Sequence, residues 1–131
     1  YYKKRIEKKN IELVITKINT GKHYRVLNPQ ENQVKMIGSK VSKELATHEF
    51  VGIAYFSQRG AEILKDVYMD SKNKYENLNF QEAIDFDSAA ITDILQEIID
   101  RGYNVNILEI NNGWVEIQSM EDYKTAVEMI I

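Results

Sequence analysis

The sequence predicts an α/β fold in which helices flank a mixed sheet that carries an inserted β-hairpin. Residues 50–56 form a near-continuous apolar run, which is typical of a strand buried on both faces. In residues 91–99, isoleucine and leucine recur at i, i+3, i+4, i+7 and i+8, which is the spacing of one helix face. Strand-like and helix-like segments alternate along the chain, and this order is the pattern of an α/β domain.

The first part of the chain predicts a strand and a hairpin. Residues 2–9 form a short, charged helical pattern, and residues 11–18 alternate apolar and polar side chains as a strand does. Residues 24–27 and 33–37 predict two short strands joined by the loop 28–32, which contains the only proline. We therefore expect a hairpin inserted between longer strands.

The middle of the chain predicts a buried strand followed by a helix. The strand covers residues 49–56, and Ser57 is placed to cap a helix that runs to about Tyr68. Residues 69–86 have weak periodicity, so we expect a loop or irregular helix there. For the helical pattern of residues 91–99, Asp87 or Ser88 is the expected cap, and Gly102 is expected to end the helix.

The last part of the chain predicts two strands and a helix. Residues 103–110 and 114–118 are strand-like, and Asn-Asn-Gly at 111–113 is a tight turn between them. Ser119 with Asp122 three residues later is a start signal for a helix. We expect the buried stripe of that helix to contain Tyr123, Ala126, Val127, Ile130 and Ile131.

Composition limits the class of protein. The chain has 131 residues, 44% of them hydrophobic and 28% charged, as an ordinary globular domain has. It has no cysteine, which excludes disulfides and thiolate metal sites, and its net charge of −3 argues against general nucleic-acid binding. No apolar run reaches membrane-spanning length and no signal-peptide pattern opens the chain. We expect a cytoplasmic protein with neither nucleic-acid nor membrane partners.

The sequence begins without methionine, in what the charged pattern suggests is the middle of a helix. We therefore expect residues 1–131 to be a single domain or part of one, within a longer protein. If half of a sheet is missing, unpaired strand groups are exposed. Self-association into a homo-oligomer is then expected, with residues 11–18 or 49–56 as the open edge.

Three segments together resemble a known family. They are Gly-Trp-Val-Glu-Ile-Gln at 113–118 with Asp122-Tyr123 and Ala126 behind it, Glu-Phe-Val-Gly-Ile-Ala at 49–54, and Thr-Asp-Ile-Leu-Gln at 92–96 with Arg101-Gly102-Tyr103. In this order and spacing they resemble the MobA-like nucleotidyltransferases, in particular the cytidylyltransferase type often fused to phosphoenolpyruvate phosphomutase. One departure is clear, because Gln118 stands where that family carries Asp.

The resemblance implies a fold and an activity. The fold is the C-terminal half of a Rossmann-like nucleotidyltransferase domain, with the nucleotide-binding part upstream. The activity is transfer of an NMP group, CMP first among them, from a nucleoside triphosphate to a phosphonate or phosphorylated acceptor. Candidate acceptors are 2-aminoethylphosphonate, phosphocholine and sugar phosphates, and the cofactor is Mg²⁺. The parent protein is then expected to act in phosphonate biosynthesis.

The resemblance also implies which residues form the site. Glu116 and position 118 face the metal, although the amide of Gln118 offers a neutral oxygen in place of a carboxylate. Without the resemblance, the sequence favours the interpretation of Glu116 as a strand glutamate in a surface ion pair. His23 and His48 have no further ligand at metal spacing, so we interpret both as structural.

The acceptor side is expected to contain Glu49, Asp93 and Trp114. A carboxylate at Glu49 beside a buried strand needs a partner, unless it lies in solvent at the strand start. Asp93 is also a first-turn carboxylate that favours the helix dipole. Trp114 either stacks on a ligand or covers a choline or aminoethyl cation, or it belongs to the core.

Two functions from different classes remain open. One is the nucleotidyltransferase described above. The other is a non-catalytic binding or oligomerisation lobe of a degenerate nucleotidyltransferase, which Gln118 and the lack of a glycine-rich phosphate loop favour.

Overall fold

The structure is a computed structural model that describes residues 9–17, 25–27, 32–111 and 113–130. The predicted turn 19–22, His23 and most of the segments 2–9 and 28–32 lie outside these residues. The strands are β1 (Ile11–Lys17), β2 (Arg25–Leu27), β3 (Met36–Gly38), β4 (His48–Phe56) and β5 (Asn106–Ile110). The helices are α2 (Gln58–Lys74), α3 (Ile91–Asp100) and α4 (Met120–Ile130).

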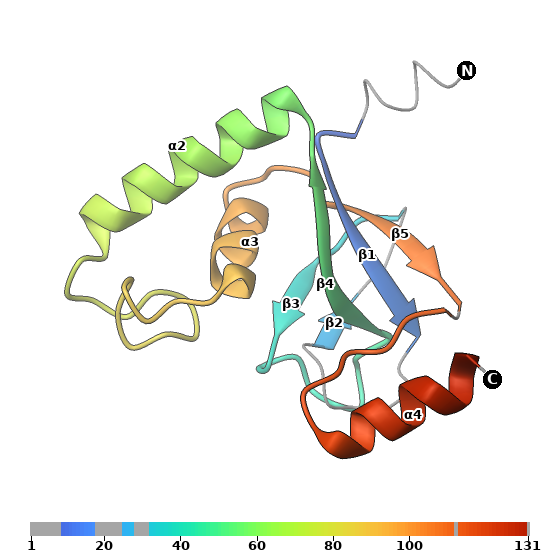
Figure 1. The fold of residues 1–131 in the computed structure, drawn as a ribbon. Coiled ribbons are helices and arrows are strands. Elements are labelled where there is room, and N and C mark those ends of the chain that lie inside the picture. The colour runs from blue at the N-terminus through green and yellow to red at the C-terminus, as the bar shows by residue number, and fades with distance from the viewer. Residues whose placement is uncertain (1–8, 18–24, 28–31, 112, 131) are drawn as a thin grey trace.

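The strands form one mixed sheet in the order β3-β2-β4-β1-β5 (Figure 1). β1 pairs with β5 in parallel, and the other pairs are antiparallel. The predicted mixed sheet with an inserted hairpin, β2–β3, is confirmed. The expectation that residues 11–18 or 49–56 form an open edge is wrong, because β1 and β4 each have neighbours on both sides.

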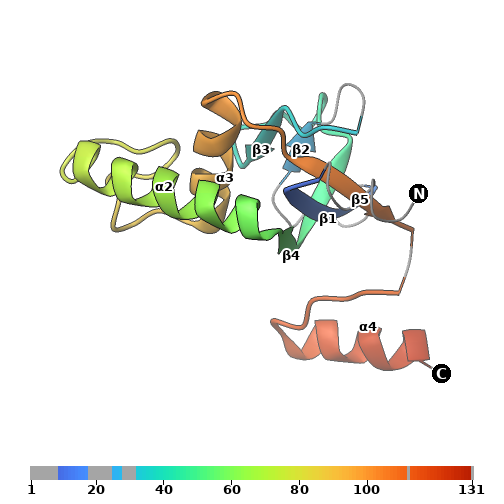
Figure 2. The same cartoon turned by 90° about the horizontal axis from the view of Figure 1, so that it is seen from above.

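The core lies between one face of the sheet and the helices α2 and α3. Alternate residues of β1 point to this face, and Ile11, Leu13 and Ile15 are completely buried there. Figure 2 shows α4 set apart from the sheet and from α2 and α3.

The prediction that residues 49–56 are buried on both faces is wrong. In β4, Phe50 is buried, but Ile53 is 60% exposed and Tyr55 is 48% exposed. The ladder between β1 and β4 shifts register between Leu13 and Ile15, and Gly52 in the facing part of β4 has a φ of +90°, which suits a residue without a side chain. The outer face of β4 is therefore an exposed apolar surface in the described part of the chain.

The first helix, α2, starts as predicted and continues further. The Ser57 hydroxyl accepts a hydrogen bond of 3.0 Å from the Gly60 amide, which confirms the cap. The Ser57 amide donates to the Asn10 carbonyl oxygen at 2.8 Å, so the helix begins against the start of β1. The helix extends to Lys74, beyond its predicted end near Tyr68, and Ser71 in this extension is completely buried and accepts a hydrogen bond from Arg101.

The second helix, α3, forms where the periodicity predicts it and buries Ile94, Leu95 and Ile98, but Ile91 is 50% exposed and the predicted cap is wrong. Its N-cap is Ala90, and not Asp87 or Ser88, because the Asp93 carboxylate accepts the Ala90 amide at 2.8 Å. Gly102 follows the helix end with φ of +92°, as expected for a helix-ending glycine.

Two predictions for the C-terminal part are wrong. Residues 114–118 belong to no strand, and of the stripe predicted for α4 only Ala126 is buried. Tyr123 and Ile130 are exposed, and Ile131 lies outside the described residues. The physical reason is common to both: in the described part of the chain no strand pairs with the segment, and most of the predicted apolar stripe of the helix is left uncovered. No helix of the described residues is long and apolar enough to cross a membrane.

Candidate functional site

The candidate site lies at the edge of the sheet where β1 and β5 end. These strands are parallel, so their carboxyl ends meet at one edge, and the antiparallel β4 begins there (Figure 1). Open α/β sheets hold ligands outside the carboxyl ends of their parallel strands. The segment 113–119 continues from β5 and therefore starts beside this edge.

Glu116 and Gln118 are brought together in this segment. The Gln118 side-chain amide donates a hydrogen bond of 2.7 Å to Glu116 Oε1. In extended backbone, residues i and i+2 point to the same side, and both side chains are exposed here. The expectation that Glu116 lies in a strand is wrong, but its proximity to position 118 is as the alternation predicts.

The segment is firmly joined to α4. Asp122 Oδ2 accepts the amides of Gln118 and Ser119 at 3.0 and 3.1 Å, and the Ser119 hydroxyl accepts the Asp122 amide at 3.1 Å. This confirms the helix start predicted from Ser119 and Asp122. It also places a carboxylate at the positive end of the helix dipole and fixes the direction in which the segment leaves the helix.

The oxygen atoms of Glu116 and Gln118 are suitable for part of the coordination shell of a Mg²⁺ ion. Mg²⁺ takes oxygen ligands and is commonly bound by one or two protein carboxylates, with water and substrate phosphates completing the octahedron. Glu116 offers a carboxylate and Gln118 a neutral amide oxygen. Among the described residues, no group of three or more Asp, Glu or His side chains could hold a metal ion. The pair therefore fits Mg²⁺ only as part of the set of ligands that the ion needs.

His48 and Glu109 meet at the same edge. His48 Nε2 lies 3.0 Å from Glu109 Oε1, and His48 Nδ1 lies 2.7 Å from the Thr47 hydroxyl oxygen. The contact joins β4 to β5 across β1. Both ring nitrogens are engaged, which agrees with a structural interpretation of His48. Glu109 carries no signal in the sequence, because its neighbour is distant in the chain and meets it only through the sheet order.

Glu49 is completely buried in β4, opposite Thr16 of β1 and Arg25 of β2 in the strand ladders. Burying a carboxylate is costly unless polar neighbours compensate it, as the sequence indicated. The structure thus places Glu49 inside the sheet, and contact with an acceptor stays a prediction.

Asp93 lies in the first turn of α3, away from the pair Glu116–Gln118. Its carboxylate accepts the backbone amides of Glu82 at 3.1 Å and Ala90 at 2.8 Å, so it fastens the preceding loop to the helix. Because α3 and α4 lie well apart, the structure does not bring Asp93 to the segment before α4 that contains Glu116 (Figure 2). A contact between Asp93 and an acceptor stays a prediction.

Trp114 is half-buried and lies in the same segment as Glu116. Gly113 precedes it with φ of +94°, a backbone conformation that glycine adopts without strain. Of the three residues expected on the acceptor side, Trp114 is the one placed beside the metal-binding candidates.

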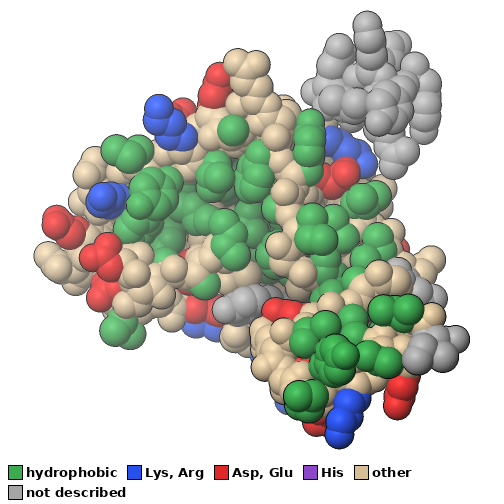
Figure 3. Space-filling model, in the orientation of Figure 1, with side chains coloured by type: hydrophobic (Ala, Val, Ile, Leu, Met, Phe, Trp, Pro, Cys, Tyr) green, Lys and Arg blue, Asp and Glu red, His purple; other side chains and the backbone are tan. Residues whose placement is uncertain are grey.

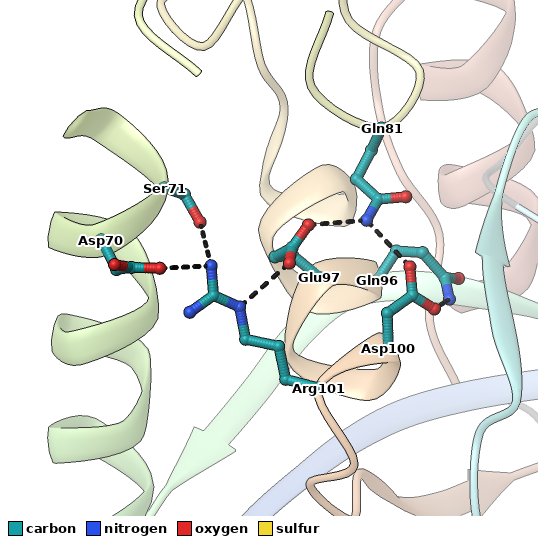
Figure 4. Close-up of polar contacts among 7 residues, drawn as sticks. All are labelled: Asp70, Ser71, Gln81, Gln96, Glu97, Asp100 and Arg101. Carbon is teal, nitrogen blue, oxygen red and sulfur yellow. Dashed lines mark hydrogen bonds and ion pairs between the residues drawn. The ribbon is translucent and has the colours of Figure 1, made fainter. Parts of the chain in front are cut away.

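A polar network that the sequence patterns do not reveal fastens α2 to α3 (Figure 4). Arg101 Nε donates to Glu97 at 2.9 Å, and its terminal nitrogen contacts Asp70 at 2.8 Å and Ser71 at 3.2 Å. The Gln81 amide donates to Glu97 at 3.0 Å, which ties the loop between the helices to the same carboxylate. The hydrogen bond with Glu97 is the main reason why the pKa of Arg101 is raised; burial opposes it.

A groove of about 550 Å³ lies between α2, α3 and the loop that joins them. Figure 3 shows hydrophobic side chains over this region. The Phe86 ring packs with Tyr68 and Phe80 at centroid distances of 5.2 Å. None of the five predicted site residues lines this groove.

Comparison with solved structures identifies the fold. The chain is similar to the inositol-1-phosphate CTP transferase from T. maritima, with a TM-score of 0.65, 21% identity and coverage of 92% of this chain and 44% of that one. It is similar to a protein described as a glucose-1-phosphate thymidylyltransferase from Bacillus anthracis, in complex with sucrose, with TM-score 0.64, 14% identity and coverage of 98% and 46%. It is also similar to a nucleoside-diphosphate-sugar pyrophosphorylase from Vibrio cholerae RC9, with TM-score 0.65, 15% identity and coverage of 93% and 48%.

These similarities establish the fold. The chain has the Rossmann-like nucleotidyltransferase fold that the sequence predicted, and it spans less than half the length of the three solved chains. The sequence matches no protein-family model and no curated protein sequence.

Proposed function

We propose that this chain forms part of a nucleotidyltransferase. The reaction moves an NMP group, CMP first among them, from a nucleoside triphosphate to a phosphonate or phosphorylated small molecule, and it releases pyrophosphate. The observation that carries the proposal is the similarity of nearly the whole chain to three solved proteins whose names describe nucleotidyl transfer or nucleoside-diphosphate-sugar chemistry.

The residues at the sheet edge support this proposal. Glu116 and the amide oxygen of Gln118 would hold Mg²⁺ together with ligands from the remainder of the fold. When bound, Mg²⁺ neutralises phosphate charge and orients the triphosphate. Trp114 is the best-placed acceptor contact, because an aromatic face attracts a choline or aminoethyl cation. Glu49 and Asp93 remain acceptor candidates that would act from their places in β4 and α3.

The acceptor class is part of the proposal. The candidate acceptors are the phosphonate 2-aminoethylphosphonate and two kinds of phosphate ester, phosphocholine and sugar phosphates. Each of them presents a dianionic oxygen group to the α-phosphorus of the triphosphate. A parent protein that also carries a phosphoenolpyruvate phosphomutase domain would supply a phosphonate acceptor. This association rests on the resemblance of residues 113–118, 49–54 and 92–96 to the cytidylyltransferase type.

Pyrophosphate release tests the proposal. The chain alone is expected to be inactive with CTP, Mg²⁺ and each acceptor, because it lacks a glycine-rich phosphate loop. The product of the complete reading frame is expected to release pyrophosphate with at least one acceptor. Activity of the chain alone would contradict the proposal that the active site also needs residues from the remainder of the fold. Inactivity of the complete product with every triphosphate and acceptor would contradict the proposed function.

A second function is a binding lobe without catalysis. The observation that favours it is the neutral Gln118 in a region where the described residues offer no group of three metal ligands. A complete product that binds CTP in calorimetry but releases no pyrophosphate would support this alternative.

A further inference from the structure

The groove between α2, α3 and the loop that joins them has the size of a small-molecule site. Its volume is about 550 Å³, and ligand pockets typically measure roughly 300–1,000 Å³. One wall is a stripe of α2 in which Ala61, Leu64, Lys65 and Tyr68 follow each other at i, i+3, i+4 and i+7. No candidate residue of the sheet edge lines the groove, so the proposed function does not account for it.

Contacts within the structure hold the loop side of the groove in place. Phe80 is completely buried, and the Phe86 ring packs against it at a centroid distance of 5.2 Å. The backbone amides of Phe80 and Ala83 each donate to the carbonyl oxygen of the other, at 3.0 and 2.8 Å, which closes a turn in the loop. A groove that is already formed binds a ligand without a large cost of ordering.

The lining of the groove favours a ligand with an apolar body. Tyr68 is 45% exposed and Ile91 is 50% exposed, although both line this hollow (Figure 3). Covering them removes apolar surface from water, which is favourable. The ring of Tyr68 meets Phe86 edge to face at 5.2 Å, so an aromatic ligand finds further rings to pack against.

The groove also presents one charge of each sign. Lys65 and Asp87 are the charged residues that line it, and both side chains are exposed. Neither forms an ion pair with another residue in the described part of the chain. A ligand with a carboxylate for Lys65 and an ammonium group for Asp87 is complementary to both, whereas a ligand with a single charge meets one like charge.

We propose that this groove binds a small zwitterion with an apolar body, the class that contains the amino acids with large apolar side chains. The apolar body lies against Leu64, Tyr68 and Phe86, the carboxylate pairs with Lys65, and the ammonium group pairs with Asp87. The site does not depend on nucleotidyl transfer, so a binding measurement tests it without any activity.

A nuclear magnetic resonance titration locates the ligand. L-Phenylalanine is added to the product of the complete reading frame, and saturable chemical-shift changes are expected at Leu64, Tyr68 and Phe86. Ile53 on β4 and Tyr123 on α4 are exposed apolar residues outside the groove, and their signals should not move. The absence of saturable changes up to the solubility limit overturns the proposal, as do changes confined to Ile53 or Tyr123.

Three analogues test the class of ligand. 3-Phenylpropionate and phenethylamine keep the ring and each lack one charge, and glycine keeps both charges without an apolar body. We expect each of them to bind at least about tenfold more weakly than L-phenylalanine, because each loses one of the three interactions. An analogue that binds as tightly as L-phenylalanine overturns the proposal.

Matched variants test the residues. Lys65→Met and Asp87→Asn are each expected to weaken the binding of L-phenylalanine by about tenfold. Lys72→Met is the control, because Lys72 is exposed on the same helix two turns further along and does not line the groove. Equal affinities of Lys65→Met and Lys72→Met overturn the proposal.

A filling variant tests the groove without changing its charge. Ala61→Phe places a ring in the groove and is expected to abolish binding, with circular dichroism checking that the helices are intact. A folded Ala61→Phe variant that binds L-phenylalanine as wild type does also overturns the proposal.

Discussion

Arg101 at the end of α3 and Asp70 near the end of α2 form an ion pair with a nitrogen–oxygen distance of 2.8 Å. The same guanidinium donates to Glu97, whose side chain is 12% exposed. Arg101 thus joins two helices and compensates a largely buried carboxylate at once.

Replacing Arg101 is expected to destabilise the fold. Arg101→Met leaves Glu97 without its charged partner and should lower the free energy of unfolding by about 2 kcal/mol in urea denaturation. Arg59→Met is the matched control, because Arg59 and Glu62 form an exposed pair at 3.3 Å. The control should change the stability by no more than about 0.5 kcal/mol. Equal losses of unfolding free energy in the two variants would show that the Arg101 network stabilises the fold no more than an exposed ion pair does.

The contribution of Arg101 should not vary with pH near neutrality. The hydrogen bond with Glu97 raises the pKa of Arg101, with burial opposing this and Asp70 adding to it. A raised pKa in the folded state gives stability that is present below the unfolded pKa and lost only as the pH rises through the folded value. The stability difference between wild type and Arg101→Met should therefore stay constant from about pH 7 to about pH 9. A fall within this range would contradict the assignment.

Gly60 is expected to tolerate no side chain. A Cβ atom there would lie 2.0 Å from the Asn10 carbonyl oxygen, which belongs to backbone and cannot turn away. Gly60→Ala should lower the free energy of unfolding by about 2 kcal/mol, despite the higher helix propensity of alanine. Gln58→Ala, at an exposed position of the same first turn, should change the stability little. A Gly60→Ala variant as stable as wild type would show that α2 can shift from β1.

Local patterns predicted most elements because each carries its own signal. The stripe of α3 is complete within residues 91–99, and the cap of α2 needs only Ser57 and Gly60. The extension of α2 to Lys74 was missed because Ser71 is buried through Arg101, which lies in another part of the fold. The strand at 114–118 was predicted wrongly because a strand also needs a partner, which alternation cannot supply.

The same distinction applies to the candidate site. Proximity of Glu116 and Gln118 follows from a spacing of i, i+2 and was accessible to sequence reasoning. The meeting of His48 with Glu109 depends on the order of the sheet and was not accessible. The burial of Glu49 between β1 and β2 was also not accessible to sequence reasoning, which predicted only that this carboxylate needs a partner.

Asp93 provides a test that separates a structural from a binding role. Asp93→Ala removes the acceptor of the Glu82 and Ala90 amides and should lower the free energy of unfolding by about 1 to 2 kcal/mol. Asp87→Ala, at one of the two exposed residues that the sequence predicts as a cap, should change the stability by less than about 0.5 kcal/mol. Unchanged stability together with a raised KM for the acceptor in the complete product would assign Asp93 to binding instead.

Position 118 is expected to control the affinity for Mg²⁺. In the complete product, Gln118→Asp should lower the half-saturating Mg²⁺ concentration by about tenfold, because a carboxylate replaces a neutral oxygen. Gln118→Asn preserves the amide and is the control. Weaker Mg²⁺ dependence or a raised KM for the acceptor in Gln118→Asp would show that Gln118 contacts the anionic acceptor, which a carboxylate repels.

Glu116 should be required for turnover but not for folding. Glu116→Ala in the complete product is expected to lower kcat strongly and to leave the thermal midpoint unchanged, because its side chain is exposed. Wild-type turnover with unchanged Mg²⁺ dependence would assign Glu116 to the surface. Circular dichroism of both proteins checks that the fold is intact.

The two ends of the parallel strand pair β1–β5 lie beside different kinds of residues: packing contacts at one end and candidate site residues beyond the other. At the amino end of β1, Gly60 and Ser57 hold the first turn of α2 against Asn10. Beyond the carboxyl end of β5, the chain continues to the exposed Glu116 and Gln118. The contacts that hold the helix to the sheet and the proposed metal-binding residues therefore lie at opposite ends of the sheet. If Glu116 and Gln118 hold a metal ion as proposed, a substitution there leaves the contacts at the other end of the sheet intact, so a variant that is abundant and well folded can still lack activity.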